Sequence, residues 1–196
     1  MDISVKIAYR NEKLQAARLA AGMSQSQLAA AAGISVLISA AEDNPSDTYY
    51  MGYDLEMARE FIEVAGEWAK RFSMLSSAVE QYVFEDPENP EKNIKAFRIT
   101  FANGRKIVAL PSVPRALRGK QGFVLIDEAA FHDDLGEVLK AAFALLIWGG
   151  KVLILSTHDG EDNPFNELIN DIRSGKKPYK LLRCTFDDAL KDGLYQ

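Results

Sequence analysis

The chain has 196 residues, of which 47% are hydrophobic and 26% are charged, values that suit one soluble α/β domain with a core of its own. Its formal net charge of -5 argues against a protein that holds DNA over its whole surface, so any DNA contact should be local or belong to a larger assembly. Cys184 is the only cysteine, which excludes an internal disulfide framework and a cysteine-based zinc site. His132 and His158 are too few for a multi-histidine metal site.

The N-terminal sequence and the apolar stretches do not suggest export or a membrane. The N-terminal sequence MDISVKIAYRNEK lacks the apolar core of a signal peptide. The longest apolar stretch, around Leu139 to Trp148, is far too short to span a bilayer. We therefore expect a cytoplasmic protein with no membrane partner.

Residues 1–47 differ in character from the rest of the chain. Ile3 to Tyr9 predicts a short strand. The Ala-rich stretch from Asn11 to Ala41 predicts helical structure that is broken near Gly22 and again at Gly33. A polar turn, EDNPSD, closes this segment. We treat residues 1–47 as a helical N-terminal segment and residues 48–196 as the main domain.

Apolar strands alternate with helices along the main domain. We expect strands at Thr48–Tyr53, Tyr82–Phe84, Lys95–Phe101, Lys106–Leu110, Phe123–Ile126, Lys151–Leu155 and Tyr179–Thr185, and helices at Leu55–Phe72, Leu135–Trp148 and Pro164–Ser174. Continuously apolar strands that alternate with helices are typical of a mostly parallel sheet with both faces covered. The fold class is therefore α/β.

The segment FVLIDEAAFHDD carries the strongest chemical signal. A short apolar strand ends in two adjacent carboxylates, Asp127 and Glu128. Ligands of open α/β sheets bind beyond the carboxyl ends of the strands. A nucleoside triphosphatase needs one carboxylate there for Mg²⁺, which Asp127 fits, and a second to orient or deprotonate the attacking water, which Glu128 fits. The alternative is a strand that simply ends in acidic residues at the surface.

The segment KVLILSTH repeats this pattern of an apolar strand with a polar end. If the two strands lie side by side, Ser156, Thr157 and His158 face the same crevice, with Ser156 near Asp127. These side chains would then hydrogen-bond the phosphate or the catalytic water. The alternative is a polar loop that caps the next helix.

The loop PSVPRALRGKQG is basic. Arg115, Arg118 and Lys120 are suited to meet phosphate, either of a nucleotide or of DNA, and we single out Arg118. The alternative is ordinary solvated surface charge.

Taken together and in this order, these segments resemble the ATPase domain of phage large terminases, most closely the branch found in Mu-like prophages. The resemblance runs from about Thr48 to the C-terminus. Its most specific parts are RGKQGFVLIDEAAFHDD and, at the right interval, IWGGKVLILSTHDGEDNPFN.

The resemblance implies an additional-strand, catalytic-glutamate type of P-loop ATPase that uses ATP and Mg²⁺ to drive viral DNA into a capsid. Asp127 corresponds to the Walker B aspartate and Glu128 to the catalytic glutamate, while Ser156-Thr157-His158 corresponds to the motif that couples hydrolysis to domain movement. The implied partners are double-stranded DNA, the small terminase subunit and the portal protein, with a ring of identical subunits around the DNA. Nothing in the sequence looks like the carboxylate cluster of the family's nuclease domain, so nuclease activity is not expected of this chain.

The phosphate-binding loop of that family falls in the N-terminal segment. Gly22-Met23-Ser24 matches its end, with Ser24 as the residue that would reach Mg²⁺. However, Arg18 is the only nearby cation, no lysine stands in the loop, and no apolar strand leads directly into it. Such a loop would hold phosphate poorly, because it normally supplies backbone N–H groups and a cation. We therefore expect a truncated or weakly active ATPase.

The same stretch, residues 14–44, also resembles the helix-turn-helix of phage-repressor-type regulators. Its recognition helix would lack any Arg or Lys for DNA. The alternative function is therefore a non-enzymatic DNA-binding regulator with a decayed ATPase body. A third interpretation is a structural pair of Ala-rich helices.

Overall fold

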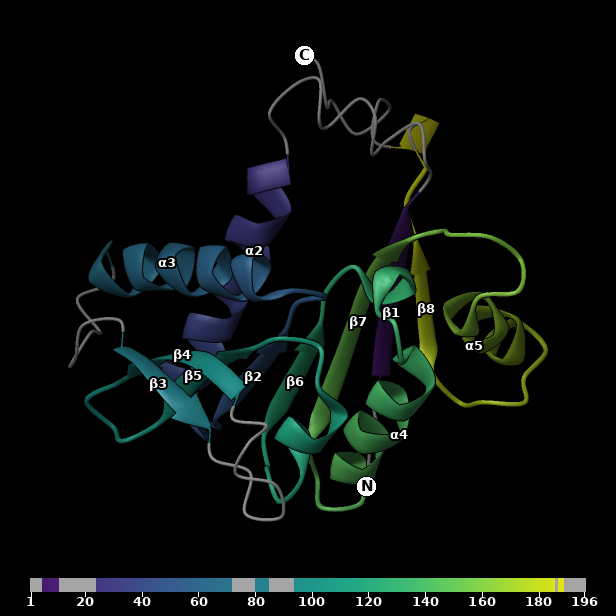
Figure 1. The fold of residues 1–196 in the computed structure, drawn as a ribbon. Coiled ribbons are helices and arrows are strands. Elements are labelled where there is room, and N and C mark those ends of the chain that lie inside the picture. Colours follow the sequence, from purple (N-terminus) through teal and green to yellow (C-terminus); the bar gives the residue numbers. More distant parts are fainter. Residues whose placement is uncertain (1–4, 11–23, 72–79, 85–93, 186, 189–196) are drawn as a thin grey trace.

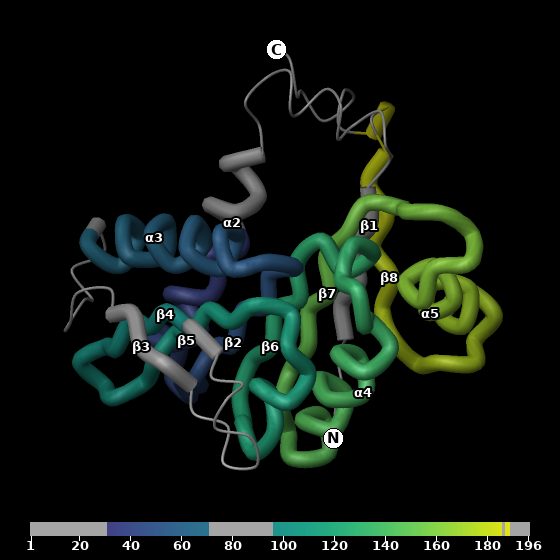
Figure 2. Tube along the Cα trace, viewed as in Figure 1, coloured from purple at the N-terminus to yellow at the C-terminus, as the bar shows by residue number. Residues whose placement is uncertain are grey.

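One eight-stranded sheet runs through the molecule, with the strand order β3-β4-β5-β2-β6-β7-β1-β8. The computed structural model describes residues 5–10, 24–71, 80–84, 94–185 and 187–188, and Figure 2 follows the chain. The strands are β1 (Val5–Arg10), β2 (Thr48–Met51), β3 (Glu80–Phe84), β4 (Ile94–Thr100), β5 (Lys106–Leu110), β6 (Phe123–Ile126), β7 (Lys151–Thr157) and β8 (Lys180–Arg183).

The sheet is mostly parallel, as the sequence predicts. From β5 across to β8 every neighbouring pair of strands is parallel, whereas β3 and β4 extend the other end by antiparallel pairing. The central strands β2 and β6 are buried along their whole length. Strands covered on both faces need apolar side chains at every position, which explains why these strands read as continuous apolar runs rather than alternating ones.

Helices cover both faces of the sheet (Figure 1). Helices α2 (Ser24–Ala40) and α3 (Leu55–Arg71) pack on one face, and α4 (Leu135–Leu146) and α5 (Pro164–Arg173) pack on the other. Two short 3₁₀ helices, η2 (Pro114–Leu117) and η3 (Ala129–Phe131), lie in the loops that flank β6. No helix in the described ranges is long and apolar enough to cross a membrane.

The expected helix break at Gly33 is wrong, because α2 runs uninterrupted from Ser24 to Ala40. A Cβ atom on Gly33 would lie 3.5 Å from Cε2 of Trp68, so this position is covered by the indole of α3. Packing of α2 on α3 outweighs the low helix propensity of one glycine. The helix-turn-helix interpretation requires a turn at Gly33, and α2 has none there.

Strand β1 lies between β7 and β8 and is parallel to both. Residues 5–10 therefore complete the sheet that residues 48–183 form. Strand β1 is the described element before α2 in the chain. It does not run directly into Gly22-Met23-Ser24, because residues 11–21 lie between them. It ends at Arg10, and residues 11–23, which include Arg18 and Gly22, lie outside the described residues.

Candidate functional site

The connections of the sheet change direction between β1 and β7. From β1 the chain passes through α2 to β2 on one side, whereas from β7 it passes through α5 to β8 on the other. The last residues of the two strands, Arg10 and Thr157, are paired in register. In open α/β sheets the crevice beyond such a switch point is where ligands bind. The strands end at the upper edge of the sheet in Figure 1, the side on which α2 begins.

Asp127 follows β6, the neighbour of β7 on the side away from β1. Its backbone N–H donates to the carbonyl of Met51 at 3.0 Å, and only 7% of the residue is exposed. Its carboxylate accepts two hydrogen bonds, one from the Tyr50 hydroxyl at 3.2 Å and one from the Glu128 backbone N–H at 3.0 Å. The acid is thus fixed at the edge of the sheet, one strand from the switch point.

Tyr50 is a site residue that the sequence analysis missed. It is fully buried in β2, and its ring stacks on Phe61 of α3 with 3.7 Å between ring centroids. Burial raises the pKa of Tyr50 well above the usual tyrosine value, and the charge of Asp127 adds to the shift. The phenol therefore stays protonated and donates to the carboxylate. A tyrosine in a predicted buried strand could have indicated a nearby hydrogen-bond acceptor, because a buried hydroxyl requires a partner.

Glu128 is the one non-glycine residue in the described ranges with a left-handed backbone, at φ 48° and ψ 46°. Its carbonyl accepts from the backbone N–H of Phe131 at 2.9 Å, which begins the turn η3. A left-handed glutamate is unfavourable by itself and persists only where the surroundings hold it, as is common at functional sites.

The turn η3 is held by residues from two other elements. The backbone N–H of Ala130 donates to the Ser156 hydroxyl of β7 at 2.9 Å. The Asn163 side-chain amide donates to the Ala130 carbonyl at 2.8 Å, while its oxygen caps α5 by accepting from the Phe165 N–H. The predicted closeness of the Asp127 and Ser156 ends of two parallel strands is therefore confirmed.

Thr157 ends β7 on the opposite face from Ser156. Its residue is fully buried, and its hydroxyl oxygen makes no hydrogen bond to the parts of the chain that the structure describes. A buried hydroxyl without a partner loses its hydration and gains nothing in return. It lies at the switch point, so a bound ligand is a suitable partner for it.

His158, the third residue of the predicted group, is tied to α5. Its Nε2 lies 2.8 Å from Oδ1 of Asn166, whose side-chain nitrogen donates to the Glu161 carbonyl at 2.8 Å. Ser156 and His158 thus connect β7 to η3 and α5 respectively, whereas Thr157 has no such connection among the described residues.

His132 also belongs to the site, although the sequence analysis did not identify it as a site residue. Its Nε2 lies 2.9 Å from the carbonyl oxygen of Asp127, and its Nδ1 lies 2.7 Å from the hydroxyl of Ser112. Burial lowers the pKa of His132, which favours the neutral imidazole. The motif DEAAFHDD placed this histidine close to the carboxylates in sequence, but only the fold shows that its ring turns back toward Asp127.

A hollow of about 590 Å³ opens beside η3, on the face of α4 and α5. Five carboxylates line it, from the loops that lead into α4 and α5: Asp133, Asp134, Asp159, Glu161 and Asp162. This negative charge repels phosphate. This hollow is therefore unsuited to a phosphate group.

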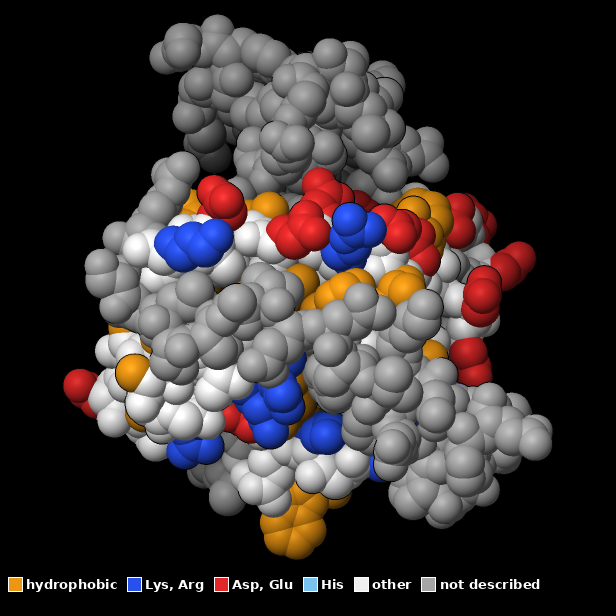
Figure 3. All heavy atoms as spheres, turned by 60° about the vertical axis from the view of Figure 1, so that its left-hand side comes forward, with side chains coloured by type: hydrophobic (Ala, Val, Ile, Leu, Met, Phe, Trp, Pro, Cys, Tyr) orange, Lys and Arg blue, Asp and Glu red, His pale blue; other side chains and the backbone are white. Residues whose placement is uncertain are grey.

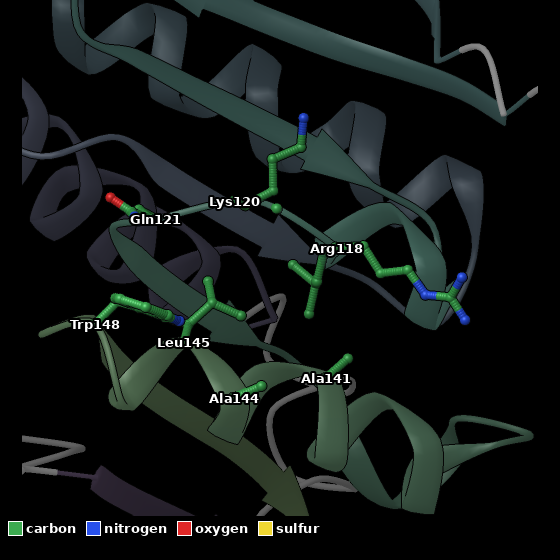
Figure 4. A pocket seen from close by; sticks show the side chains of 9 residues that line it. Arg118, Lys120, Gln121, Ala141, Ala144, Leu145 and Trp148 are labelled. Carbon is green, nitrogen blue, oxygen red and sulfur yellow. The ribbon is translucent and has the colours of Figure 1, made fainter. Parts of the chain in front are cut away.

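Arg118 lies in the loop between η2 and β6. It lines a separate hollow of about 300 Å³ between residues 117–121 and the C-terminal half of α4. In Figure 4 its guanidinium group extends away from Trp148, while Leu145 of α4 and Trp148, two residues beyond the end of α4, face the loop. The role of Arg118 as a phosphate contact stays a prediction, as do those of Arg18 and Gly22, and Ser24 is placed only as the first residue of α2.

Charge is mixed on the face of the molecule in Figure 3. Acidic side chains gather on its upper part, the side on which the strands end, and Lys and Arg side chains lie both among them and lower down. The described residues on this face thus form no continuous basic surface. This agrees with the expectation that any DNA contact is local.

Comparison with known proteins gives two relatives by sequence, and no family model matches the chain. The chain is 48% identical over 167 residues to the Mu-like prophage FluMu protein gp28 of Haemophilus influenzae, a match that covers 85% of this chain and 32% of that protein. It is 49% identical over 152 residues to the probable terminase large subunit gp28 of Escherichia phage Mu, covering 76% of this chain and 27% of that one. The chain thus spans about a third of the length of these relatives.

Solved structures share its fold. The large terminase of a thermophilic bacteriophage superposes with a TM-score of 0.56 at 16% identity, over 96% of this chain and 42% of the other. The same terminase in complex with ADP gives a TM-score of 0.55. The large terminase ATPase domain of a Thermus phage gives 0.52 at 16% identity, over all of this chain and 84% of that domain. The chain is therefore a relative of the large terminase subunits of Mu-like phages and has the fold of the terminase ATPase domain.

Proposed function

We propose that this chain is the ATPase domain of a phage DNA-packaging motor, which binds Mg²⁺-ATP beyond the carboxyl ends of β1, β7 and β6. The observation that carries the proposal is the position of the Asp127–Glu128 pair. It lies at the end of β6, one strand from the switch point between β7 and β1. The fold and the relatives support this function, because both point to large terminases.

The residues present fit Mg²⁺-ATP. Asp127 offers a carboxylate held by two donors, and Thr157 offers a buried hydroxyl that no described residue engages. Mg²⁺ prefers a few oxygen ligands from the protein together with phosphate oxygens. Bound Mg²⁺ would neutralise the phosphate charge that develops in hydrolysis. From the family resemblance we add Ser24 as a Mg²⁺ ligand, with Gly22 and Arg18 beside the phosphates.

Glu128 is proposed to orient the attacking water and accept its proton. Its left-handed backbone is fixed on the C-terminal side by η3, which Ser156 and Asn163 hold in place. A fixed backbone limits where the carboxylate can lie, which favours this role because a misplaced base loses most of its effect on the rate.

The three residues that end β7 are proposed to pass the state of the nucleotide to the surrounding elements. Thr157 would contact phosphate or the catalytic water, while Ser156 and His158 link β7 to η3 and α5 through hydrogen bonds of 2.9 and 2.8 Å. A small movement at the phosphate would thus shift elements on the α4 and α5 face.

In the intact motor we propose double-stranded DNA, a small terminase subunit, a portal protein and further copies of this chain in a ring as partners. The names of the relatives support this assignment. Arg118, in the loop between η2 and β6, is proposed to contact phosphate of DNA or nucleotide.

Calorimetric titration with Mg²⁺-ATP tests the proposal. The wild-type chain should bind, and Asp127→Ala and Thr157→Val should each weaken binding. Asp162→Asn removes a carboxylate from the acidic hollow at the same edge of the sheet and serves as the matched control. We expect it to bind as the wild type does. Absence of any binding by the wild type, or equal weakening by all three variants, would overturn the proposed site.

A further inference from the structure

Three segments of the chain meet at His132. The imidazole belongs to the loop after η3, Ser112 belongs to the loop after β5, and Asp127 directly follows β6. His132 is 5% exposed, so water competes little for these hydrogen bonds. Ser112 lies on the same loop as Arg115 and Arg118, between β5 and β6.

The carbonyl partner fixes the direction of one hydrogen bond, and the neutral ring then fixes the other. The carbonyl of Asp127 can only accept, so Nε2 of His132 carries the hydrogen. In a neutral ring Nδ1 then has no hydrogen, and it accepts from the Ser112 hydroxyl at 2.7 Å. This position thus requires a side chain with a donor at one end and an acceptor at the other, and a neutral imidazole has both.

The carbonyl that His132 binds belongs to the peptide bond between Asp127 and Glu128. Rotation of this peptide would change the left-handed backbone of Glu128 and would break the bond to Nε2 at the same time. The turn η3 holds Glu128 from its C-terminal side, through Ser156 and Asn163. His132 holds the peptide on the N-terminal side.

We propose that His132 is a positioning residue that, with Ser112, locks the Asp127–Glu128 peptide in the geometry needed for hydrolysis and ties it to the loop that carries Arg115 and Arg118. The catalytic consequence rests on the proposed ATPase function. The hydrogen-bond pattern does not, and it is tested separately.

The first experiment determines the tautomer of His132 by NMR on the full chain labelled with ¹⁵N-histidine. The chain has two histidines, so a His158→Asn variant assigns the spectrum. We expect His132 to be protonated on Nε2 alone, and Ser112→Ala to shift the Nδ1 resonance most. A ring protonated on Nδ1, or one that averages between the two tautomers, would overturn the proposed geometry whether or not the chain hydrolyses ATP.

The second experiment measures the single-turnover rate of ATP hydrolysis, with the chain in excess, beside the Kd for Mg²⁺-ATP. His132→Ala should lower the rate by about 10²-fold, the loss that misplaced catalytic groups typically cause, and should change the Kd far less. His132→Gln keeps an N–H donor at the reach of Nε2 and should recover part of the rate. Ser112→Ala should cause a smaller loss than His132→Ala.

Asn103→Ala is the matched control. It removes a side-chain hydrogen bond of 2.9 Å to the Ser39 carbonyl, which joins two elements away from this site. It should reduce thermal stability without slowing hydrolysis. An unchanged rate in His132→Ala, or an equal loss in Asn103→Ala, would show that His132 has only a structural role. If the wild type itself neither binds nor hydrolyses ATP, the proposed function and the catalytic role of His132 fail together, and the NMR result still decides the hydrogen-bond pattern.

Discussion

Tyr50 and Asp127, on the adjacent strands β2 and β6, are joined by a hydrogen bond of 3.2 Å from the phenol to the carboxylate. The ring of Tyr50 in turn stacks on Phe61 of α3, at 3.7 Å between centroids. The orientation of the proposed Mg²⁺ ligand therefore depends on packing between the sheet and a helix on the face opposite η3 and α4.

Tyr50→Phe should destabilise the chain by about 1–2 kcal/mol, because it keeps the stacked ring and removes a donor to a buried carboxylate. The urea unfolding midpoint measures this loss. Tyr53→Phe is the control, since Tyr53 is 46% exposed and should change the midpoint little. Equal midpoints for Tyr50→Phe and the wild type would mean that the hydrogen bond contributes nothing.

Glu128→Gln should abolish ATP hydrolysis and leave Mg²⁺-ATP binding nearly intact, because it removes the proposed base and keeps the proposed metal ligand. Asp127→Ala should weaken the binding itself. Phosphate release and calorimetric Kd separate the two effects. Glu137→Gln, on the exposed side of α4 and paired with Lys140, should change neither value. Full turnover by Glu128→Gln would show that the assigned roles are wrong.

Gly122→Ala should cost about 1–3 kcal/mol of stability. Gly122 has φ 141°, and a Cβ there would lie 2.2 Å from the carbonyl oxygen of Asp47, the same oxygen that accepts from the Phe123 N–H at 2.9 Å. Gly136→Ala provides the contrast, because Gly136 lies in α4 with nothing within 4 Å of its Cβ position. It should be neutral or slightly stabilising. Thermal unfolding that ranks the two variants in the opposite order would contradict this account.

The apolar runs of the sequence predicted the strands and helices of residues 48–185 well, because buried parallel strands leave a clear local pattern. For the same reason, the sequence could predict that Ser156 and Asp127 lie close together at the ends of adjacent strands. Gly33 could not be placed correctly, since the indole of Trp68 that covers it lies far along the chain. The bonds of His132 to Ser112 and Asp127 also depend on how loops return over the sheet, which no local pattern encodes.

Arg118 shows a second limit of the sequence. The basic composition of its loop suggested a phosphate contact but did not say how the loop crosses the sheet. The loop runs along α4 and enters β6 at the edge opposite Asp127, where Lys151 N–H donates to the Gly122 carbonyl. Sequence distance to a strand does not say which end of the strand a loop residue approaches.

The last prediction is that this chain, purified alone, hydrolyses ATP slowly. No lysine stands in the proposed phosphate loop, and Ala20 and Ala21 occupy positions where polar or basic residues are expected. Loss of one charge-stabilising group typically lowers a rate by about 10²–10³-fold, or roughly 3–4 kcal/mol. Arg18 is the cation nearest in sequence to Gly22, and a guanidinium group can bind phosphate through two hydrogen bonds.

A steady-state phosphate-release assay, with and without double-stranded DNA, checks this prediction. We expect turnover below about 1 s⁻¹, the lower end of ordinary enzyme rates. Arg18→Ala should reduce the residual rate further, and Ala21→Lys should raise it if a missing cation is the cause. Arg173→Ala, at the end of α5, is a control that removes an arginine away from the proposed loop and should leave the rate unchanged. Turnover of about 1 s⁻¹ or more by the wild type would show that the loop is functional as it stands, and that the interpretation of it as a poor phosphate-binding loop is wrong.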